Sequence, residues 1–300
     1  MKLSSGDKTL HTFIYIFLVL LGIATLYPFW NAAVISFNVG MDTSRGGVTF
    51  WPRAFTLDNY RIVFQDGRIV TAFYISVLRT ISGTILSIFM TAIFAYGMSV
   101  KGVMGKKFYM VFAVITMYFS GGLIPYYLLN VELGLMNKFM VMVIPTAVSV
   151  FNMIIFRTFF MGLPSGLEES ARIDGASTFG IFFKIVLPLS GPVLATLSLF
   201  TAVYHWNDWF TPTIFITKTE LFPVQTMLQQ ILNSNIMSEQ LSIATKGNAS
   251  AADALSRMQS VTTKSLTMAT MMVATIPIIM VYPFVQKYFV KGVLVGSLKE

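Results

Sequence analysis

Long apolar runs dominate the chain, and six of them are long enough to cross a lipid bilayer. Four runs contain no charged residue: Phe13–Phe37, Phe108–Val131, Phe139–Phe156 and Ser265–Gln286. Two further runs contain one charge each: Arg79 in Ile69–Val100 and Asp208 in Ile185–Thr217. A hydrocarbon core about 30 Å thick requires about 20 helical residues, and a helix satisfies its own backbone hydrogen bonds in lipid. The pattern therefore predicts six transmembrane helices, at about residues 13–37, 71–100, 108–130, 139–161, 193–217 and 265–288.

The composition supports a membrane protein and excludes several other classes. Of the 300 residues, 55% are hydrophobic and 11% are charged, and the mean hydropathy is +0.71. Soluble domains carry about 25% charged residues, so too little polar sequence remains to cover six buried helices in water. A transmembrane β-barrel would show alternating segments of about ten residues, and the sequence has none. The absence of cysteine excludes disulfides and thiolate metal sites.

The distribution of basic residues predicts that both termini are cytoplasmic. With that orientation the inner segments hold eleven lysines and arginines and the outer segments nine. Eight of the outer nine lie in two long segments, residues 40–68 and 218–264, which translocate regardless of charge. The short loop Lys101–Lys107 alone holds three lysines. Although the net charge is +8, the basic residues are split between both faces, so we expect no nucleic-acid partner.

The segment between the fourth and fifth runs, residues 163–188, has the pattern of an ordered cytoplasmic helix–turn–helix. Ser165 and Glu168 match S-x-x-E, a capping box that begins a helix. Gly175 stands where a left-handed C-cap requires glycine. Ser177 is placed to cap a second short helix, which a following proline limits. The alternative is an amphipathic elbow that only anchors the bundle.

The same segment carries a recognisable motif. Glu169-Ser170-Ala171, then Gly175 after three residues, then Ile185-x-Leu187-Pro188 resembles the EAA motif of binding-protein-dependent ABC importer permeases. Only Ser170, where alanine is usual, departs from it. Three further stretches resemble carbohydrate permeases of the maltose type (second permease), most nearly the LplC/YtcP-like oligosaccharide permeases: residues 50–60, 119–127 and 204–210.

This resemblance implies an all-α, type I ABC importer permease (MetI-like) fold in a bacterial plasma membrane. It implies a carbohydrate importer in which a coupling helix docks on a separate ATPase subunit, with no enzymatic activity and no cofactor here. The expected partners are two ATPase copies, a second homologous permease, an extracytoplasmic sugar-binding protein and membrane lipid. The residues that the motif assigns to coupling are Glu168, Glu169, Ala171, Asp174, Gly175, Leu187 and Pro188.

A candidate translocation path lies late in the fifth predicted helix. Sugars bind by stacking on aromatic faces and by side-chain hydrogen bonds, and the run from residue 204 to 209 supplies both kinds of group. An interfacial aromatic belt is an equally good interpretation. We predict that Arg79, at a comparable depth, pairs with Asp208, the alternative being that Arg79 extends to the interface. The candidate path residues are Arg79, Tyr204, Trp206, Asn207, Asp208 and Trp209.

Three other features leave alternatives open. The polar outer segment 218–264 either contacts the binding protein or is a flexible connector, and the tail Lys291–Glu300 either reaches the ATPase or is frayed. A stand-alone secondary transporter would need acidic residues near mid-membrane, and only Asp208 is available. An intramembrane enzyme is disfavoured, because the chain has two histidines, no cysteine and no H-E-x-x-H.

Overall fold

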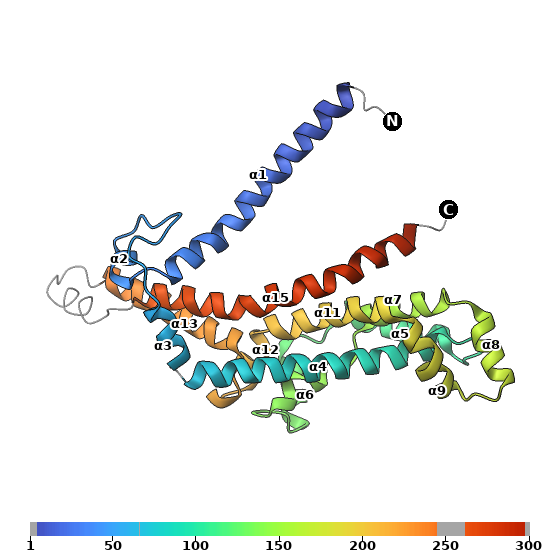
Figure 1. The fold of residues 1–300 in the computed structure, drawn as a ribbon. Helices are drawn as coiled ribbons and strands as arrows, with labels where there is room; N and C mark the ends of the chain where they lie inside the picture. The colour runs from blue at the N-terminus through green and yellow to red at the C-terminus, as the bar shows by residue number, and fades with distance from the viewer. Residues whose placement is uncertain (1–4, 66, 245–261, 298–300) are drawn as a thin grey trace. The chain divides into compact units, whose positions relative to one another are not determined.

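The computed structural model describes residues 5–65, 67–244 and 262–297, and its regular structure there is helical apart from one antiparallel bridge between Asn38 and Phe55 (Figure 1). The α-helices longer than seven residues are α1 Ser5–Ser36, α3 Asp58–Gln65, α4 Gly67–Ser99, α5 Lys106–Tyr118, α6 Leu123–Glu132, α7 Val150–Met161, α8 Ser165–Ile173, α11 Gly191–Asn207, α13 Val224–Ala244 and α15 Thr263–Ser297. The shorter elements are α2 Gly40–Ser44, α9 Thr178–Ile181, α10 Leu187–Leu189, α12 Phe210–Phe215, a π-helical stretch Phe182–Val186, and 3₁₀ turns at Phe139–Met142, Ile144–Thr146 and Thr219–Leu221.

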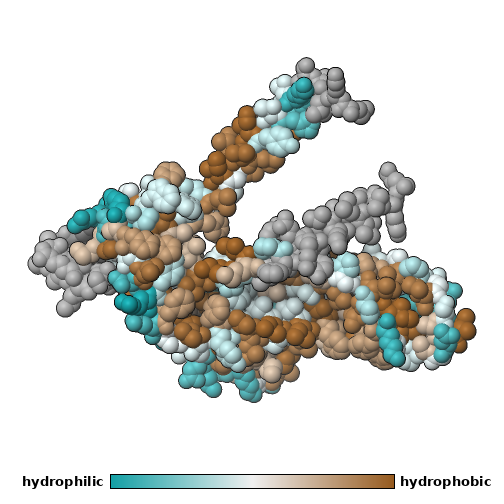
Figure 2. Space-filling view, in the orientation of Figure 1, coloured by the Kyte–Doolittle hydropathy of each residue, from teal (hydrophilic) through white to brown (hydrophobic). Residues whose placement is uncertain are grey.

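The chain divides into two compact units. The first unit comprises Met1–Val70 with Leu228–Ile276, and the second comprises Thr71–Met227 with Pro277–Glu300. Figure 2 shows hydrophobic residues on much of the exposed surface, including the middle of α1. A soluble domain rarely exposes apolar patches larger than a few hundred Å², so these surfaces are built to contact lipid or protein.

In the first unit, α1 is an apolar helix that packs against nothing over most of its length. Its apolar stretch within Gly6–Ser36 has no residue buried inside the structure. Only its last turns are buried, where Val34 and Ile35 pack with Val48. A 31-residue helix whose apolar stretch is not buried by the described part of the chain requires lipid or another subunit to cover it.

The segment that follows α1, predicted to be an outer segment, is ordered by a polar network. The Asn59 side-chain amide donates to the backbone oxygens of Ser36 (2.8 Å) and Asn38 (3.0 Å). The Asn38 amide donates to Asp42 Oδ2 (2.9 Å), which also accepts from Arg53 Nε (3.0 Å). The hydrogen bond from Asn38 and the charge of Arg53 hold the pKa of the Asp42 carboxyl below its usual value.

Two of the predicted spans are uninterrupted helices. The spans expected at residues 13–37 and 71–100 correspond to α1 and α4, and both pass a length and hydropathy test for crossing a membrane. The last span, expected at residues 265–288, corresponds to the longer α15.

The span expected at residues 108–130 is not one continuous helix. It is split into α5 and α6, whose axes meet at 113°. The break falls at Phe119–Gly122, where Gly122 has a φ of +88° that side-chain-bearing residues rarely adopt. The two consecutive glycines at 121 and 122 explain why the apolar run does not continue as a helix.

The other two predicted spans are also broken. Residues 139–161 form two 3₁₀ turns, the second containing Pro145, and then α7 at 45° to them. The fifth span, expected at residues 193–217, is α11 followed by the separate short helix α12, because Asp208 is extended. A 21-residue helix, α13, occupies part of the segment 218–264, for which the sequence left open contact with a binding protein or a flexible connector.

Candidate coupling segment and transport site

The coupling segment, residues 163–188, begins with α8, which ends in the glycine cap expected from the sequence. Gly175 has a φ of +81°. Its N–H donates to the Arg172 oxygen (3.1 Å), and the Ala176 N–H donates to the Ala171 oxygen (2.9 Å). These two bonds form a Schellman motif, which satisfies carbonyls that the helix end leaves without partners. The expectation of a glycine C-cap is confirmed.

The expected capping box at the start of α8 is wrong. The N-cap is Pro164, which has no side-chain cap, and Ser165 is already the first residue of the helix. The Pro164 oxygen instead accepts from the Leu167 N–H (3.2 Å). Because proline fixes φ near −65°, it can set the direction of the chain entering a helix without a side-chain cap.

The second helix of the coupling segment begins as predicted and ends one residue later than expected. The Ser177 side chain accepts from the Gly180 N–H at 3.1 Å. The helix then runs to Leu189, past Pro188, through the π-helical stretch Phe182–Val186. A π-helical turn widens the helix where proline would otherwise clash with the preceding turn.

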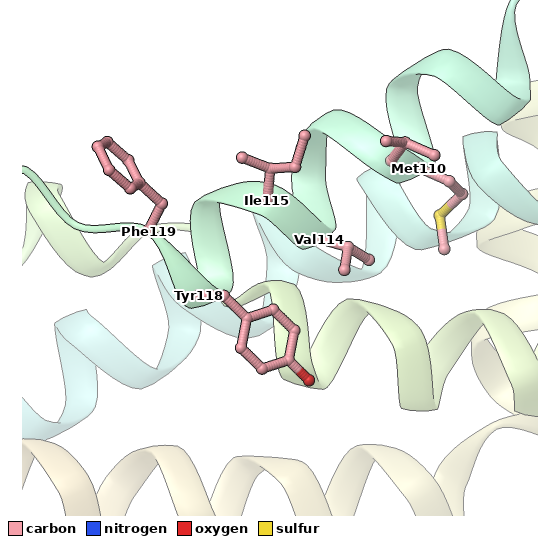
Figure 3. Close-up of a pocket in the computed structure, with 6 residues that line it drawn as sticks. Met110, Val114, Ile115, Tyr118 and Phe119 are labelled. Carbon is pink, nitrogen blue, oxygen red and sulfur yellow. The ribbon is translucent and has the colours of Figure 1, made fainter.

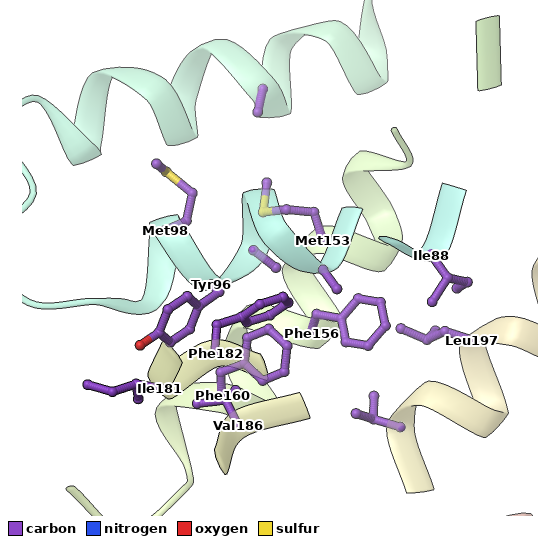
Figure 4. Packing of buried hydrophobic residues seen from close by; sticks show 14 residues of the cluster. Ile88, Tyr96, Met98, Met153, Phe156, Phe160, Ile181, Phe182, Val186 and Leu197 are labelled. Carbon is purple, nitrogen blue, oxygen red and sulfur yellow. The ribbon is translucent and has the colours of Figure 1, made fainter. Parts of the chain in front are cut away.

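The coupling segment is attached to the membrane helices by a core cluster of buried aromatic and aliphatic side chains (Figure 4). Phe182 of the coupling segment lies 5.1 Å, between ring centroids, from Tyr96 of α4. Tyr96 also lies 6.3 Å from Phe160 of α7. Val186 belongs to the same cluster, as does Leu197 of α11. A displacement of this segment therefore moves α4, α7 and α11 with it, because closely packed interiors transmit strain.

The motif residues divide into two groups by their exposure. Ala171 and Leu187 are half-buried and pack against the core cluster. Glu168 is also half-buried. The exposed members are Glu169, Asp174, Gly175 and Pro188. The motif assigns all seven residues to coupling, whereas in the structure Glu168, Ala171 and Leu187 are half-buried and only the others are exposed.

Two apolar side chains that the motif does not include are exposed beside its acidic residues. Ile173 is 87% exposed and Phe179 is 66% exposed. An isolated exposed apolar residue needs no explanation, but two on a short, doubly capped segment together with Glu169 and Asp174 form a surface suited to a protein partner. We call Glu169, Ile173, Asp174 and Phe179 the docking face.

The ion pair predicted between Arg79 and Asp208 is present. Arg79 of α4 is 1% exposed. Its Nη2 pairs with Asp208 Oδ2, and its Nη1 donates to the Asp208 backbone oxygen at 2.7 Å. The alternative, in which Arg79 extends to the membrane interface, is excluded by its burial.

Asp208 also caps α12. Its Oδ1 accepts from the backbone N–H groups of Phe210 and Thr211, both at 3.0 Å. Both carboxylate oxygens of Asp208 and the two terminal nitrogens of the Arg79 guanidinium are thus engaged within the protein, whereas the buried Arg79 Nε has no hydrogen-bond partner. The pair joins α4 to the break between α11 and α12, so neither charge is free to bind a transported molecule.

The aromatic residues of the candidate path do not form one surface. Trp206 is buried and packs edge-to-face on Phe73, with ring centroids 5.7 Å apart. Tyr204, Asn207 and Trp209 are exposed. Trp206 is therefore a packing residue between α4 and α11, and the others remain candidates for contact with a sugar.

A polar cavity that the sequence did not predict adjoins Tyr204. It has a volume of about 380 Å³ and lies among residues of α4, α7, α11 and the turn before α7. Its polar lining groups belong to Ser87, Thr146, Ser149, Asn152, Thr201, Tyr204 and His205. The isolated polar residues Asn152 and Thr201 in otherwise apolar runs were the available signal, since polar groups inside membrane helices usually face the protein interior.

His205 sets how closely α4 and α11 approach. A Cβ atom added at Gly83 of α4 would lie 2.5 Å from His205 Cε1 and Nε2. His205 is 1% exposed. The glycine therefore provides the space into which the imidazole packs.

An apolar groove of about 400 Å³ runs along α5 (Figure 3). Met110, Val114, Ile115, Tyr118 and Phe119 line it, and the Tyr118 hydroxyl is the only polar side-chain group among these five. Tyr118 and Phe119 are largely exposed. The groove lacks the polar groups needed to orient a sugar, and its character suits contact with lipid or another apolar helix.

The sequence matches a protein family and several named relatives. Residues 64–295 match the family described as "Binding-protein-dependent transport system inner membrane component". The chain is 38% identical to the polygalacturonan/rhamnogalacturonan transport system permease protein YtcP of Bacillus subtilis, covering 95% of this chain and 96% of that protein. It is 37% identical to the protein LplC of the same organism, with coverage of 95% and 92%.

The fold has a solved counterpart. A chain in the crystal structure of a bacterial ABC transporter involved in the import of the acidic polysaccharide alginate superposes with a TM-score of 0.84. The two chains are 28% identical, and the match covers 96% of this chain and 99% of the other.

Proposed function

The chain belongs to the family of inner membrane components of binding-protein-dependent transport systems, and we propose that it is the permease subunit that couples ATP hydrolysis to oligosaccharide import. The resemblance predicted from the EAA motif is confirmed by this family match. The all-helical MetI-like permease fold is confirmed by the structural counterpart. The carbohydrate assignment is supported by relatives named for polygalacturonan and alginate transport.

The observation that carries the coupling proposal is the construction of the coupling segment. It is fixed at its turn by the Schellman motif at Gly175, packed by the core cluster against α4, α5, α7 and α11, and exposed along the docking face. A separate ATPase subunit would bind the docking face. ATP would then favour one permease state only through different affinities for the two states.

The motif residues have two roles in this proposal. Glu169, Asp174 and Gly175, joined by Ile173 and Phe179, contact the ATPase. The half-buried Glu168, Ala171 and Leu187, with Pro188, fix the segment to the bundle. A rigid segment transmits a rotation, whereas a mobile loop would absorb it.

We propose that the chain crosses the membrane six times with both termini in the cytoplasm. Within the described residues, α1 and α4 are long enough to cross, and two bent pairs, Lys106–Tyr118 with Leu123–Glu132 and Phe139–Thr146 with Val150–Met161, are apolar enough to cross if each forms a single span. We take α11 with α12 as the fifth span; α11 itself is bent by 82° from Thr178–Leu189 of the coupling segment. The described part of α15 includes a further apolar stretch, Lys264–Met280. The three lysines of the short loop Lys101–Lys107 support this orientation.

The proposed partners are inferred from apolar surfaces that the described part of the chain leaves exposed. The uncovered α1 and the groove on α5 support a second, homologous permease together with lipid. A symmetric pair of permeases would take two ATPase copies. The family description names dependence on a binding protein, which supports an extracytoplasmic sugar-binding partner.

The translocation path runs, in this proposal, past the polar cavity and Tyr204 rather than past the Arg79–Asp208 pair. A ligand site combines a mostly apolar wall with a few placed polar groups, and the cavity has both. A secondary transporter is a weaker candidate, because the mid-membrane acid it would need, Asp208, has both oxygens engaged.

Copurification of the ATPase subunit with tagged permease tests the coupling role. Gly175→Ala places a side chain at a φ of +81°, at a cost of about 1–2 kcal/mol, which distorts the turn. Gly166→Ala is the matched control in the same helix, since its Cβ would meet nothing within 4 Å. We expect the first variant to lose the ATPase and the second to retain it. An Ile173→Asp variant, which alters the docking face without touching the core, should also lose it; retention by both test variants would remove the coupling role.

A further inference from the structure

None of the residues that line the polar cavity is Asp, Glu, Lys or Arg. Its polar groups are hydroxyls, an amide, a phenol and an imidazole. Asn152 and Thr201 are joined across it, with Asn152 Nδ2 donating to Thr201 Oγ1 at 3.3 Å. Phe200 and Tyr204 are exposed beside these groups, which provides flat surfaces for stacking.

The nearest charges are unavailable to a ligand. Arg79 donates to both the carboxylate and the backbone oxygen of Asp208, and the second carboxylate oxygen caps α12. Releasing Arg79 to bind an anionic ligand would leave the Asp208 charge without its partner, which is strongly unfavourable for a buried pair.

One feature of the cavity, the N-terminus of α7, stabilises negative charge, but this stabilisation is small. The N-terminus of α7 begins at the cavity, where Ser149 is the N-cap. A helix N-terminus stabilises an anion only weakly. The Ser149 side chain already accepts from the Asn152 N–H, which occupies one of the free donors. Removing an unpaired carboxylate from water costs more than the helix N-terminus contributes, so the net effect on a uronate is unfavourable.

We infer that the polar cavity admits uncharged glycosyl units and excludes uronates, a specificity that rests on the proposed function. Neutral sugars present hydroxyls, which both donate to and accept from the serine, threonine and asparagine groups in the cavity. This substrate class differs from the polygalacturonan named for the relative YtcP and from the acidic polysaccharide named for the solved counterpart.

A comparison of ligands that differ only in charge tests the inference. The full chain, copurified with its companion subunits, is placed in lipid nanodiscs, and binding is measured by saturation-transfer NMR without the binding protein. The probes are trimers of galacturonate, glucuronate and mannuronate, each beside its fully methyl-esterified form. We expect at least one ester to bind about tenfold or more tightly than its acid, since about 1.4 kcal/mol corresponds to a factor of ten. Equal or tighter binding of the acids, or no binding of any ester, would overturn the inference.

Two substitutions assign the binding to this cavity. Asn152→Leu removes the amide while keeping a similar volume, and it should abolish ester binding. Val148→Lys adds a cation at an exposed position on the cavity wall and should bring acid binding, whereas the uncharged control Val148→Gln should not. Ester binding that survives Asn152→Leu would contradict the assignment, as would acid binding by the Gln variant.

The outcome separates this inference from the proposed function. In proteoliposomes that hold the complete importer, ATP-dependent uptake of an acidic oligosaccharide would refute the charge selectivity and leave the permease role standing. Absence of uptake of every oligosaccharide, acidic or neutral, would refute the permease role itself.

Discussion

The buried pair between Arg79 and Asp208 allows a quantitative test of the fold. Removing one member of a buried ion pair costs about 3–5 kcal/mol, because the other charge is left uncompensated. We therefore expect Arg79→Met and Asp208→Asn each to lower the free energy of unfolding by about that amount. The double variant removes both charges, so it should lose less than the sum of the two, with a coupling energy of about 2–3 kcal/mol.

Because Asp208 also caps α12, substitutions of Asp208 and of Arg79 do not have equivalent effects on stability. Asparagine keeps an oxygen that can cap α12, whereas Asp208→Ala loses it at a further cost of about 1 kcal/mol. For the same reason an exchange of the two side chains, Arg79→Asp with Asp208→Arg, should restore the pairing but not the cap. Recovery should therefore be incomplete by about 1 kcal/mol.

The assay is equilibrium unfolding of the purified chain in mixed micelles, followed by tryptophan fluorescence. Glu132→Gln is the control, since Glu132 is an exposed acid at the end of α6. Strict additivity of the two single substitutions would refute the reasoning. So would full recovery by the exchanged pair, because it would show that the cap contributes nothing.

Two further predictions concern other contacts. Gly83→Ala places a Cβ 2.5 Å from the His205 ring and should destabilise the chain by about 1–3 kcal/mol through overpacking. Adding His205→Ala to this variant should recover most of the lost stability. If thermal unfolding shows no recovery, the contact between Gly83 and His205 does not cause the loss. The Asp42 pKa is lowered from 3.8, first by the hydrogen bond from Asn38, so its contribution to stability is present above pH 3.8 and is lost as the pH falls below that value. Fluorescence of the exposed Trp51 should report loosening of the outer segment over this acidic range, and an Asp42→Asn variant that shows the same pH dependence would contradict the assignment.

Local capping and charge pairing were predictable because their signals are single residues with few alternatives. Gly175 and Ser177 cap their helices as expected. Arg79 and Asp208 are the only charged residues in two apolar runs. A charged side chain within the membrane is costly and usually pairs with another charged group. The capping box failed because Pro164 supplied a different start for the same helix.

The orientation of side chains in α11 was not predictable, because the helix is apolar on all sides. Periodicity cannot show which face of such a helix points inward. The sequence therefore grouped Trp206 with Tyr204, although the former packs on Phe73 and the latter is exposed. The contact between His205 and Gly83 joins positions 122 residues apart, and nothing local in either run indicates it.

The break between α5 and α6 was missed for a different reason. Hydropathy averages over a window, and two glycines in an apolar run scarcely change the average. Their backbone freedom nevertheless allows Gly122 to adopt a φ of +88°. Glycine pairs inside an apolar run are a better signal of a bent span than the length of the run.

The central claim is that the docking face lies in the cytoplasm and binds an ATPase, and the absence of native cysteine makes it directly testable. Ile173→Cys introduces a single thiol at a position that is 87% exposed. A membrane-impermeant maleimide should label it in inside-out vesicles stripped of the ATPase, and adding the ATPase back should protect it. No labelling should occur in right-side-out vesicles. Labelling from the outside would place the coupling segment where no ATPase can reach it and would contradict the account.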